Sequence, residues 1–251
     1  VVLTRLSDAQ KEKQSILAIL RGTAVNQDGR SSSLTAPNGP SQQDVIRTAL
    51  RDGQVAPRDV QYLECHGTGT ALGDPIEAGS LAAVYLSRWE RTYEPLSVGS
   101  LKANAGHTEP GAGLSGALSL LIQLSNGGLS PNAQLRSLNP HVGSALRGTV
   151  SALPVQVGRA LADARASGGV SSFGYSGTIA HTILHPTVAH HTIASKYALV
   201  PPPLKYQRHV FPWLPNSSVR QATKMYSTSW VRLDSSADAR LRAAPWLLLH
   251  D

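Results

Sequence analysis

Two histidines in polar, glycine-containing segments are the side chains best suited to chemistry in this sequence. His66 lies in Glu64-Cys65-His66-Gly67-Thr68-Gly69-Thr70, and His107 follows Lys102 by five residues and precedes Glu109 by two. An imidazole can donate a hydrogen bond to a carbonyl oxygen that becomes an enolate. We therefore predict a site that stabilises developing negative charge, with Lys102 and Glu109 close enough to pair and to orient the loop of His107. For each histidine taken alone, a structural role is the alternative.

The residues beside His66 are suited to binding an extended substrate arm rather than to acting as a nucleophile. Thr68 and Thr70 present hydroxyls on one side of a glycine-spaced segment, which suits the amides of an extended substrate. Cys65 is the one cysteine of the chain, so it forms no disulfide within it. Neighbouring side chains of an extended segment point to opposite faces, so Cys65 and His66 do not form a nucleophile–base pair. We expect Cys65 to be a small buried core residue.

Two other kinds of site are disfavoured by residue spacing. The segment Gly174-Tyr175-Ser176-Gly177-Thr178 misses the nucleophile elbow of serine hydrolases, because its last residue is threonine rather than glycine. The nine histidines are not spaced as ligand pairs near carboxylates, and His190 and His191 lie in the C-terminal tail. We therefore predict no serine-hydrolase site and no metal site.

Each histidine is predicted to follow a β-strand. The apolar runs at residues 60–64 and 96–100 are typical of strands, and a helical pattern follows each of the two polar loops. Open α/β sheets bind their ligands at the carboxyl ends of such strands. The two loops should therefore belong to one site.

Three helices are predicted around these strands. Ser41 is expected to precede a helix with one apolar face and Asp44 three residues further on. Asp74-Pro75-Ile76-Glu77 predicts a second start, with Asp74 as the N-cap, Pro75 at the first helical position and Glu77 at the third. The third helix follows the loop of His107 and contains Leu114, Leu118, Leu121 and Ile122.

Three regions differ in composition. Residues 1–186 are predicted to form an α/β domain, residues 187–224 a proline-rich extended connector, and residues 225–251 the start of another domain. The first residues are neither an initiator methionine nor a signal peptide, so we expect the chain to begin inside a longer protein. No apolar run reaches about 18 residues, so no membrane span is predicted.

The charge distribution does not favour a nucleic-acid partner. The formal net charge is +7, and the residues from 187 onward carry +5 of it in a scattered pattern. Such a pattern is typical of a solvated linker, whereas nucleic-acid domains cluster basic residues on an ordered element. A single cysteine is compatible with a reducing compartment, and a cytoplasmic location is the expectation.

The motifs, taken in order, resemble the β-ketoacyl synthase (ketosynthase) domains of modular type I polyketide synthases over about 186 residues. The resemblance implies a thiolase-like α/β fold with αβαβα layers, of which this chain holds the C-terminal half, in a domain that is usually a homodimer. The segments that carry it are residues 22–29, 34–43, 64–70, 73–77, 102–109 and 172–178.

The resemblance also implies an activity, the decarboxylative Claisen condensation of an acyl thioester with malonyl-acyl carrier protein. An upstream cysteine holds the acyl chain, and both substrates travel on the phosphopantetheine of the carrier protein, with no directly bound cofactor. The resemblance implies catalytic roles for His66, His107 and Lys102, and phosphopantetheine binding for Thr68 and Thr70. It implies supporting roles for Glu109, Phe173 and Tyr175. Tyr175 lies where the family has a phenylalanine that gates the acyl pocket.

Three departures from the family pattern bear on activity. The cysteine motif belongs to the N-terminal half, so this chain is expected to be inactive alone and to expose apolar surface that the other half covers. Ile179 stands where the family has an asparagine, and Pro110-Gly111 replace two alanines. The alternative is a non-catalytic partner, resembling a chain-length factor or a decarboxylase-like protein.

The region beyond residue 186 carries two further resemblances. Residues 204–213 are similar to the linker that wraps back onto the ketosynthase, and no acyltransferase sequence intervenes. This implies malonyl units supplied by a separate acyltransferase. Residues 225–251 are similar to the entry into the structural part of a ketoreductase.

Overall fold

The computed structural model describes residues 1–187 except positions 32, 34–35, 87–94 and 160–165. These residues belong to one compact unit of the chain, Val1–Ala194. Apart from Thr187, the predicted linker at 187–224 and the predicted following domain at 225–251 lie outside the described residues.

The described residues alternate strands with helices, as the sequence predicts for an α/β domain. The strands predicted at 60–64 and 96–100 are confirmed as β2 and β3. The elements in chain order are α1 (Leu6–Lys11), β1 (Ala18–Gln27), α2 (Gly39–Gly53), η1 (Pro57–Asp59), β2 (Val60–Glu64), α3 (Gly73–Tyr85), β3 (Leu96–Gly99), α4 (Lys102–Ala105), η2 (Glu109–Gly111), α5 (Ala112–Asn126), β4 (Gly128–Leu129), α6 (Pro140–Ala145), β5 (Ser151–Ala152), β6 (Gly158–Arg159), β7 (Ser167–Phe173) and β8 (Thr178–Pro186).

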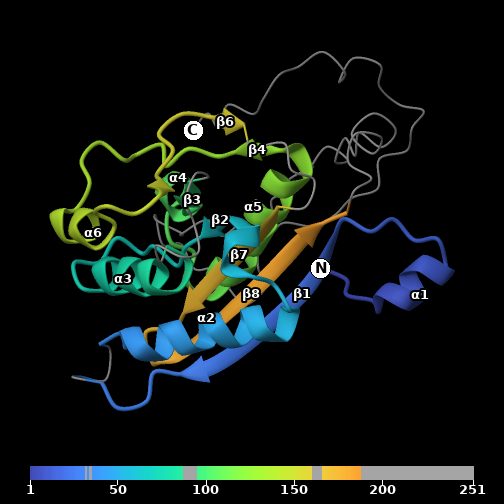
Figure 1. The fold of residues 1–251 in the computed structure, drawn as a ribbon, viewed down its shortest axis with the longest axis horizontal. Helices are drawn as coiled ribbons and strands as arrows, with labels where there is room; N and C mark the ends of the chain where they lie inside the picture. The colour runs from blue at the N-terminus through green and yellow to red at the C-terminus, as the bar shows by residue number, and fades with distance from the viewer. Residues whose placement is uncertain (32, 34–35, 87–94, 160–165, 188–251) are drawn as a thin grey trace, which may run out of the picture. The chain divides into compact units, whose positions relative to one another are not determined.

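Within the described residues, six strands form one mixed sheet in the order β1-β8-β7-β2-β3-β5 (Figure 1). β1 pairs antiparallel with β8, and β8 pairs antiparallel with β7. β7, β2, β3 and β5 run parallel to one another. The carboxyl ends of β7, β2 and β3 therefore meet at one edge of the sheet, where ligands of α/β folds bind.

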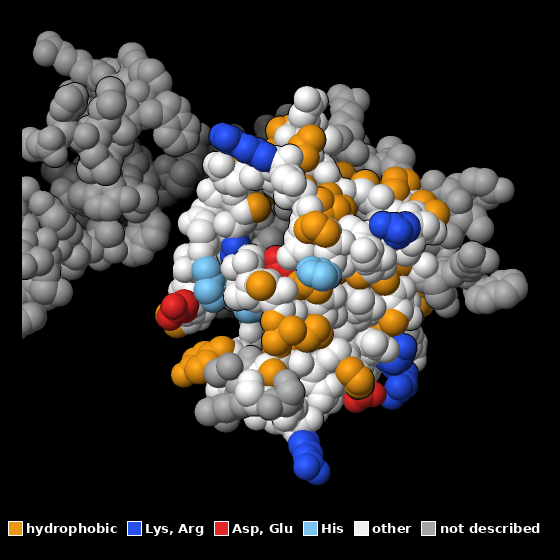
Figure 2. Space-filling model, turned by 90° about the vertical axis from the view of Figure 1, so that its left-hand side faces the viewer, with side chains coloured by type: hydrophobic (Ala, Val, Ile, Leu, Met, Phe, Trp, Pro, Cys, Tyr) orange, Lys and Arg blue, Asp and Glu red, His pale blue; other side chains and the backbone are white. Residues whose placement is uncertain are grey.

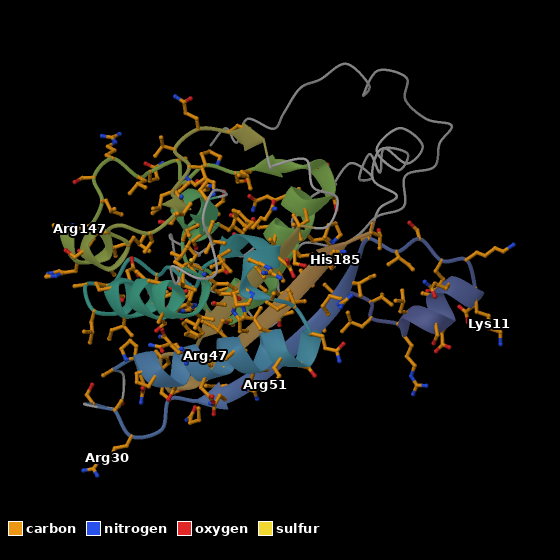
Figure 3. The ribbon with its side chains drawn as sticks, in the orientation of Figure 1. Lys11, Arg30, Arg47, Arg51, Arg147 and His185 are labelled. Carbon is orange, nitrogen blue, oxygen red and sulfur yellow. The ribbon has the colours of Figure 1, made fainter. Side chains whose placement is uncertain are left out.

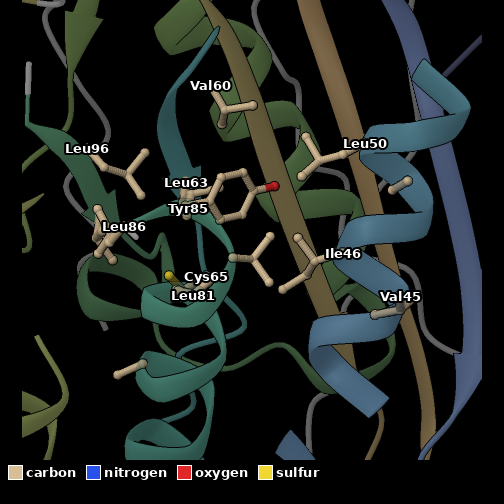
Figure 4. Close-up of a cluster of buried hydrophobic side chains, with 14 of the residues drawn as sticks. Val45, Ile46, Leu50, Val60, Leu63, Cys65, Leu81, Tyr85, Leu86 and Leu96 are labelled. Carbon is tan, nitrogen blue, oxygen red and sulfur yellow. The ribbon is translucent and has the colours of Figure 1, made fainter. Parts of the chain in front are cut away.

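Helices cover both faces of this sheet. α2 and α3 pack on one face, where they form the larger core with strands β2, β3 and β8 (Figure 4). α5 packs on the opposite face against β7 and β2, in a smaller cluster around Tyr62, Leu120 and Val170. Side chains labelled in the larger core are Val45, Ile46, Leu50, Val60, Leu63, Cys65, Leu81, Tyr85, Leu86 and Leu96.

α2 begins earlier than predicted. Asn38, not Ser41, is its N-cap, and the Asn38 side chain accepts a hydrogen bond from the Ser41 backbone N–H at 3.2 Å. Pro40 occupies an early position, where its missing N–H costs no helical hydrogen bond. The predicted face of Val45, Ile46, Ala49 and Leu50 is buried, as expected.

The predicted cap of α3 is wrong, because the helix begins at Gly73 and Asp74 lies inside it. The Thr70 hydroxyl accepts the Gly73 N–H at 3.0 Å and so satisfies a free donor of the first turn. The Asp74 carboxylate instead accepts the Gly69 N–H at 3.0 Å. Two acidic side chains of α3, Asp74 in the first turn and Glu77 in the second, accept backbone N–H groups of the turn that carries His66.

The helix predicted after His107 is α5, and the predicted apolar residues Leu114, Leu118 and Ile122 do not lie on the side that it buries. Ala112, Gly116, Leu120 and Gln123 face the sheet. The apolar row on the other side is exposed, which agrees with the expectation that this half exposes apolar surface. Exposed fractions in this row are 55% for Leu114, 42% for Leu118 and 59% for Ile122.

A histidine at the centre of the core joins three elements. His181 of β8 is fully buried, with Nε2 at 2.8 Å from the Tyr85 hydroxyl of α3 and Nδ1 at 3.0 Å from the Ser171 hydroxyl of β7. Both ring nitrogens therefore have hydrogen-bond partners, as a buried imidazole requires.

No helix among the described residues is long and apolar enough to cross a membrane.

Candidate active site

The structure brings together the two histidines that the sequence singled out. His66 follows β2, and His107 lies in the loop between α4 and α5. Their ring centroids are 5.7 Å apart, and the rings meet edge to face at 88°. His66 is partly buried and His107 is exposed. Two imidazoles at this spacing can donate to one substrate oxygen placed between them.

Phe173 closes the buried side of this pair. It is the last residue of β7, it is 8% exposed, and its ring centroid lies 5.8 Å from that of His66. Tyr175, two residues later, is 81% exposed in the β7–β8 turn. The Gly174 N–H donates to the Thr178 carbonyl at 2.7 Å, so the turn that carries Tyr175 is closed by the backbone.

The turn that carries His66 requires glycine for two reasons. Gly67 and Gly69 have φ values of +47° and +78°, which side chains with a Cβ rarely adopt. A Cβ on Gly67 would also lie 2.9 Å from the Cβ of Ser100. The backbones of the two loops can therefore approach each other only because residue 67 has no side chain.

Glu77 holds this turn from the side of α3. Its carboxylate accepts the backbone N–H groups of His66 at 2.8 Å and Gly67 at 2.9 Å, and its side chain is buried. Burial raises the pKa of Glu77 to about 7, and the two N–H donors oppose that rise because they favour the charged form. α3 thus fixes the position of His66 through one carboxylate.

The two threonines differ in their surroundings. Thr68 is partly buried and Thr70 is exposed. Since the Thr70 oxygen already accepts the Gly73 N–H, its own O–H remains a donor toward a substrate.

Three hydrogen bonds join the loops that follow β2 and β3. The Cys65 N–H donates to the Gly99 carbonyl at 2.8 Å, and the Ser100 hydroxyl donates to the Cys65 carbonyl at 3.2 Å. The Leu101 N–H donates to the Glu64 carboxylate at 2.6 Å. The segment that precedes His66 is therefore tied directly to the segment that precedes Lys102.

Two asparagines form hydrogen bonds with the loop that follows β3 and carries Lys102 and His107. The Asn132 amide accepts from the Ser100 N–H at 3.1 Å and donates to the Val98 carbonyl at 3.2 Å. Asn104 donates to the Pro131 carbonyl at 2.9 Å and accepts from the Ala133 N–H at 2.9 Å. The stretch between Lys102 and His107 is thus held on both sides.

Lys102 is attracted to buried carboxylates other than the one predicted. Its charge lowers the pKa of both Glu64 and Glu77, opposing the larger effect of burial. Glu109 is exposed, with a φ of +47°, and among the described residues it forms no ion pair with Lys102. The expected pairing fails because Glu109 lies in solvent at the η2 turn, where a carboxylate is already well hydrated.

His66 is held in its neutral form. Burial lowers its pKa to about 4, and the charges of Lys102 and His107 contribute to the same shift. A neutral imidazole has one donor and one acceptor nitrogen. Its Nδ1 is buried and has no hydrogen-bond partner among the described residues.

Cys65 has the surroundings of a core residue, as the sequence predicts. Its side chain is 8% exposed and packs in the larger core. Burial raises its pKa well above the ordinary thiol value, and the charges of Glu77 and Glu64 raise it further. A thiol in this position is protonated at neutral pH and is not a nucleophile.

Several residues of the site were missed by sequence reasoning: Glu64, Ser100 and Asn132 were given no role, and Glu77 was assigned only to a helix cap. The one signal that could have found Glu64 is an acidic residue at the end of an apolar strand, in Val60-Gln61-Tyr62-Leu63-Glu64. A buried carboxylate needs donors nearby.

The surface around the site is mixed in character. On the face shown in Figure 2, histidine side chains border a hollow, with hydrophobic side chains gathered beside it. The lysine and arginine side chains labelled in Figure 3 lie on α1, on α2 and in two loops. The lysine whose charge lowers the pKa of His66 is Lys102. Across the described residues, no group of three or more His, Cys, Asp or Glu side chains is placed to hold a metal ion.

Comparisons with known proteins agree on one family. Residues 17–136 match the model of the β-ketoacyl synthase C-terminal domain. The chain is 47% identical over 192 residues to the spectinabilin polyketide synthase system protein NorA' of Streptomyces orinoci, covering 73% of this chain and 5% of that protein. It is 46% identical over 184 residues to the polyketide synthase GfsA of Streptomyces halstedii, covering 73% of this chain and 2% of that protein. The chain thus spans a small part of these relatives.

Two solved ketosynthase domains share this fold. The ketosynthase from module 6 of the bacillaene synthase of Bacillus subtilis 168 is similar with a TM-score of 0.68 and 33% identity, over 73% of this chain and 33% of that chain. An oxazolomycin ketosynthase domain of Streptomyces albus is similar with a TM-score of 0.67 and 33% identity, over 73% and 32%. The chain therefore corresponds to about a third of each domain.

Proposed function

Because the chain contains the C-terminal domain of a β-ketoacyl synthase, at residues 17–136, we propose that it supplies half of the active site of a condensing enzyme in a polyketide synthase. The reaction is the decarboxylative Claisen condensation of an acyl thioester with a malonyl thioester. The observation that carries the proposal is the pair of imidazoles, His66 and His107, with ring centroids 5.7 Å apart at the ends of two tied loops.

The chemistry requires a site that stabilises an enolate. The malonyl carboxylate leaves as CO2, and the electron pair of the broken C–C bond moves onto the thioester carbonyl. The enolate carbon then attacks the acyl thioester carbonyl, and the thiolate that held the acyl chain leaves. Donors aimed at the enolate oxygen lower the barrier to the first step, because they bind the developing charge more strongly than the neutral carbonyl.

His66 and His107 are the proposed donors to that oxygen. Neutral His66 can present one N–H without bringing a formal charge into a partly buried site. Lys102 supplies positive charge near His66 and favours the approach of the malonyl carboxylate. Phe173 excludes water from the inner side of His66, which strengthens each of these interactions.

The nucleophile must come from another part of the protein. The one cysteine of this chain is Cys65, whose thiol is buried and has a raised pKa. We propose that an N-terminal half of the domain supplies the acyl-bearing cysteine and covers the exposed apolar row of α5. The presence of both histidines and Lys102 favours this reading over a non-catalytic partner.

The remaining assignments concern substrate delivery. Thr68 and Thr70 are proposed to bind the phosphopantetheine arm of an acyl carrier protein, and exposed Tyr175 is proposed to gate the acyl pocket. We also propose that the complete domain is a homodimer and receives malonyl units from a separate acyltransferase.

The test separates acyl loading from condensation in the full-length synthase. His107→Ala should lower condensation by about 100- to 1,000-fold, the effect of removing one oxyanion donor, and leave acylation of the nucleophilic cysteine largely intact. Intact-mass measurement reports loading, and CO2 release with product formation reports condensation.

The exposed histidine His141 on α6 provides the matched control, and His141→Ala should leave both steps unchanged. Equal loss of both steps in His107→Ala would contradict the catalytic assignment and would indicate a structural role.

A further inference from the structure

We propose that Glu64 is the positioning residue of the condensation site: it fixes the loop of Lys102 and His107 at its working distance from His66. This inference rests on the proposed function. Glu64 is the last residue of β2, two positions before His66, and its carboxylate binds the residue that precedes Lys102.

The carboxylate is held by two donors from different elements. One oxygen accepts the Leu101 backbone N–H at 2.6 Å, and the other accepts the Tyr62 hydroxyl at 3.4 Å. The Glu64 side chain is 1% exposed, so water cannot replace either donor. Since Leu101 is joined directly to Lys102, the strand that leads to His66 also sets the position of Lys102.

Helix α5 packs closely against the Glu64 side chain. Gly116 of α5 faces it so closely that a Cβ there would be 3.1 Å from the Glu64 Cγ. The Gln123 amide of α5 donates to the Tyr62 hydroxyl at 3.1 Å and accepts the Ser130 N–H at 2.7 Å. The chain of contacts from α5 through Tyr62 to Glu64 therefore resists movement of the loop away from the sheet.

The charges around Glu64 favour the same position. Lys102 attracts it from the α4 side, while Glu77 repels it from the α3 side. Tyr62 faces it on its own strand, and burial raises the pKa of Tyr62, so the hydroxyl remains a donor. Burial also raises the pKa of Glu64 to about 7, which means that its charged form depends on Lys102 and on the Leu101 N–H.

If the loop of Lys102 and His107 is not held in position, the catalytic rate should fall while substrate binding changes little. Misplacement of a catalytic group by about 1 Å can cost about 100-fold in rate. Glu64 lies beneath the loop and is buried, so its loss should move Lys102 and His107 without removing any group that touches substrate. The acyl-loading step needs neither residue and should be spared.

The experiment uses the full-length synthase with two substitutions of different severity. Glu64→Leu removes both acceptors, and we expect the kcat for malonyl decarboxylation to fall about 100-fold with KM changed less than about threefold. Glu64→Gln keeps an acceptor for the Leu101 N–H but loses the charge and replaces the oxygen that accepts the Tyr62 hydroxyl with a donor, so it should recover most of this loss and lower kcat by no more than about tenfold.

Ser167→Ala is the matched control, because it also removes a hydrogen bond of a buried hydroxyl, that to His185, at the first residue of β7 and so at the opposite end of this strand from Phe173. It should lower thermal stability to a similar degree and leave decarboxylation unchanged. If Glu64→Leu fails to fold, Glu64→Gln is compared with Ser167→Ala, since only Glu64→Gln should lower kcat.

Two results would overturn the inference: unchanged kcat in both Glu64 variants, or equal loss of acyl loading and decarboxylation. Failure of the proposed function is a different result, since the parent protein itself would then release no CO2 from malonyl-carrier protein.

Discussion

At the residue scale, burial shifts the pKa values of three side chains of the proposed site. Burial lowers the pKa of His66 to about 4 and raises those of Glu64 and Glu77 to about 7. Each carboxylate offsets its desolvation with backbone donors, and each of those donors belongs to a segment that positions a proposed catalytic group. The protein thus uses buried carboxylates as fixed acceptors for loop N–H groups, which would otherwise be unsatisfied.

The first prediction at this scale is that Cys65 accepts no acyl group. Its thiol is buried, and its raised pKa leaves almost no thiolate at neutral pH. Incubation of the folded chain with an acyl thioester, followed by intact-mass measurement, should show no adduct. After unfolding in denaturant, the same cysteine should react with a thiol reagent, which serves as the control. A stable adduct on native Cys65 would refute the assignment of the nucleophile to another segment.

At the element scale, His181 joins α3, β7 and β8 in the core of the described residues. Its two nitrogens hold hydroxyls from two neighbouring elements, Tyr85 and Ser171. A Cβ on Gly169 of β7 would lie 2.9 Å from the His181 Nε2, so the imidazole fits only against glycine. This packing keeps β7 and β8 in register, and with them the turn that carries Tyr175.

The second prediction concerns the pH dependence of stability. Burial lowers the pKa of His181 to about 3 in the folded state, against about 6.5 when unfolded. Between these values the unfolded chain binds a proton that the native state does not, so this contribution to stability is complete above about pH 6.5 and is lost as the pH falls. The stability advantage of the parent domain over His181→Gln should therefore shrink by about 2 kcal/mol between pH 7 and pH 5.

Urea unfolding of the complete ketosynthase domain at the two pH values measures this difference. His66 has the same sign of effect, and Glu64 and Glu77, with raised pKa values, have the opposite sign. Because these three groups are present in both proteins, their contributions cancel in the comparison. A difference that does not change with pH would show that His181 is not held neutral.

At the scale of the whole molecule, one helix of the described residues leaves an apolar row exposed to solvent. The exposed row of Leu114, Leu118 and Ile122 lies on α5, opposite the side that packs on the sheet. A continuous apolar row on a helix is typical of a buried face, so we expect another part of the protein to cover it.

The third prediction is that Leu118→Glu has opposite effects in two contexts. In the isolated chain it should reduce aggregation, because it interrupts an exposed apolar row. In the complete domain it should impair assembly of the two halves, since a charge would be buried without a partner, at a cost of several kcal/mol.

Light scattering of the isolated chain and size-exclusion chromatography of the complete domain measure the two effects of Leu118→Glu. Val157 is 81% exposed and lies outside α5, so Val157→Glu is the control and should leave assembly unchanged. Normal assembly of the Leu118→Glu domain would mean that this side of α5 remains in solvent.

The sequence alone determined the family, the strand-ending loops and the roles expected of His66, His107 and Lys102. These depend on local order along the chain, because each motif keeps its proposed catalytic residue within a few positions of a strand end and of glycines that a tight turn needs. The burial of Cys65 was expected because a lone cysteine is a small apolar core residue.

Tertiary structure decided how acidic side chains are used and which side of α5 is buried. Glu77 was assigned to a helix cap, yet its carboxylate binds the turn of His66; Glu109 was expected to pair with Lys102, yet the carboxylates that attract Lys102 are Glu64 and Glu77. Such choices depend on donors that are distant in sequence, such as the Leu101 N–H for Glu64, 37 positions away. Local pattern contains no information about these donors, because folding alone brings them within hydrogen-bond distance.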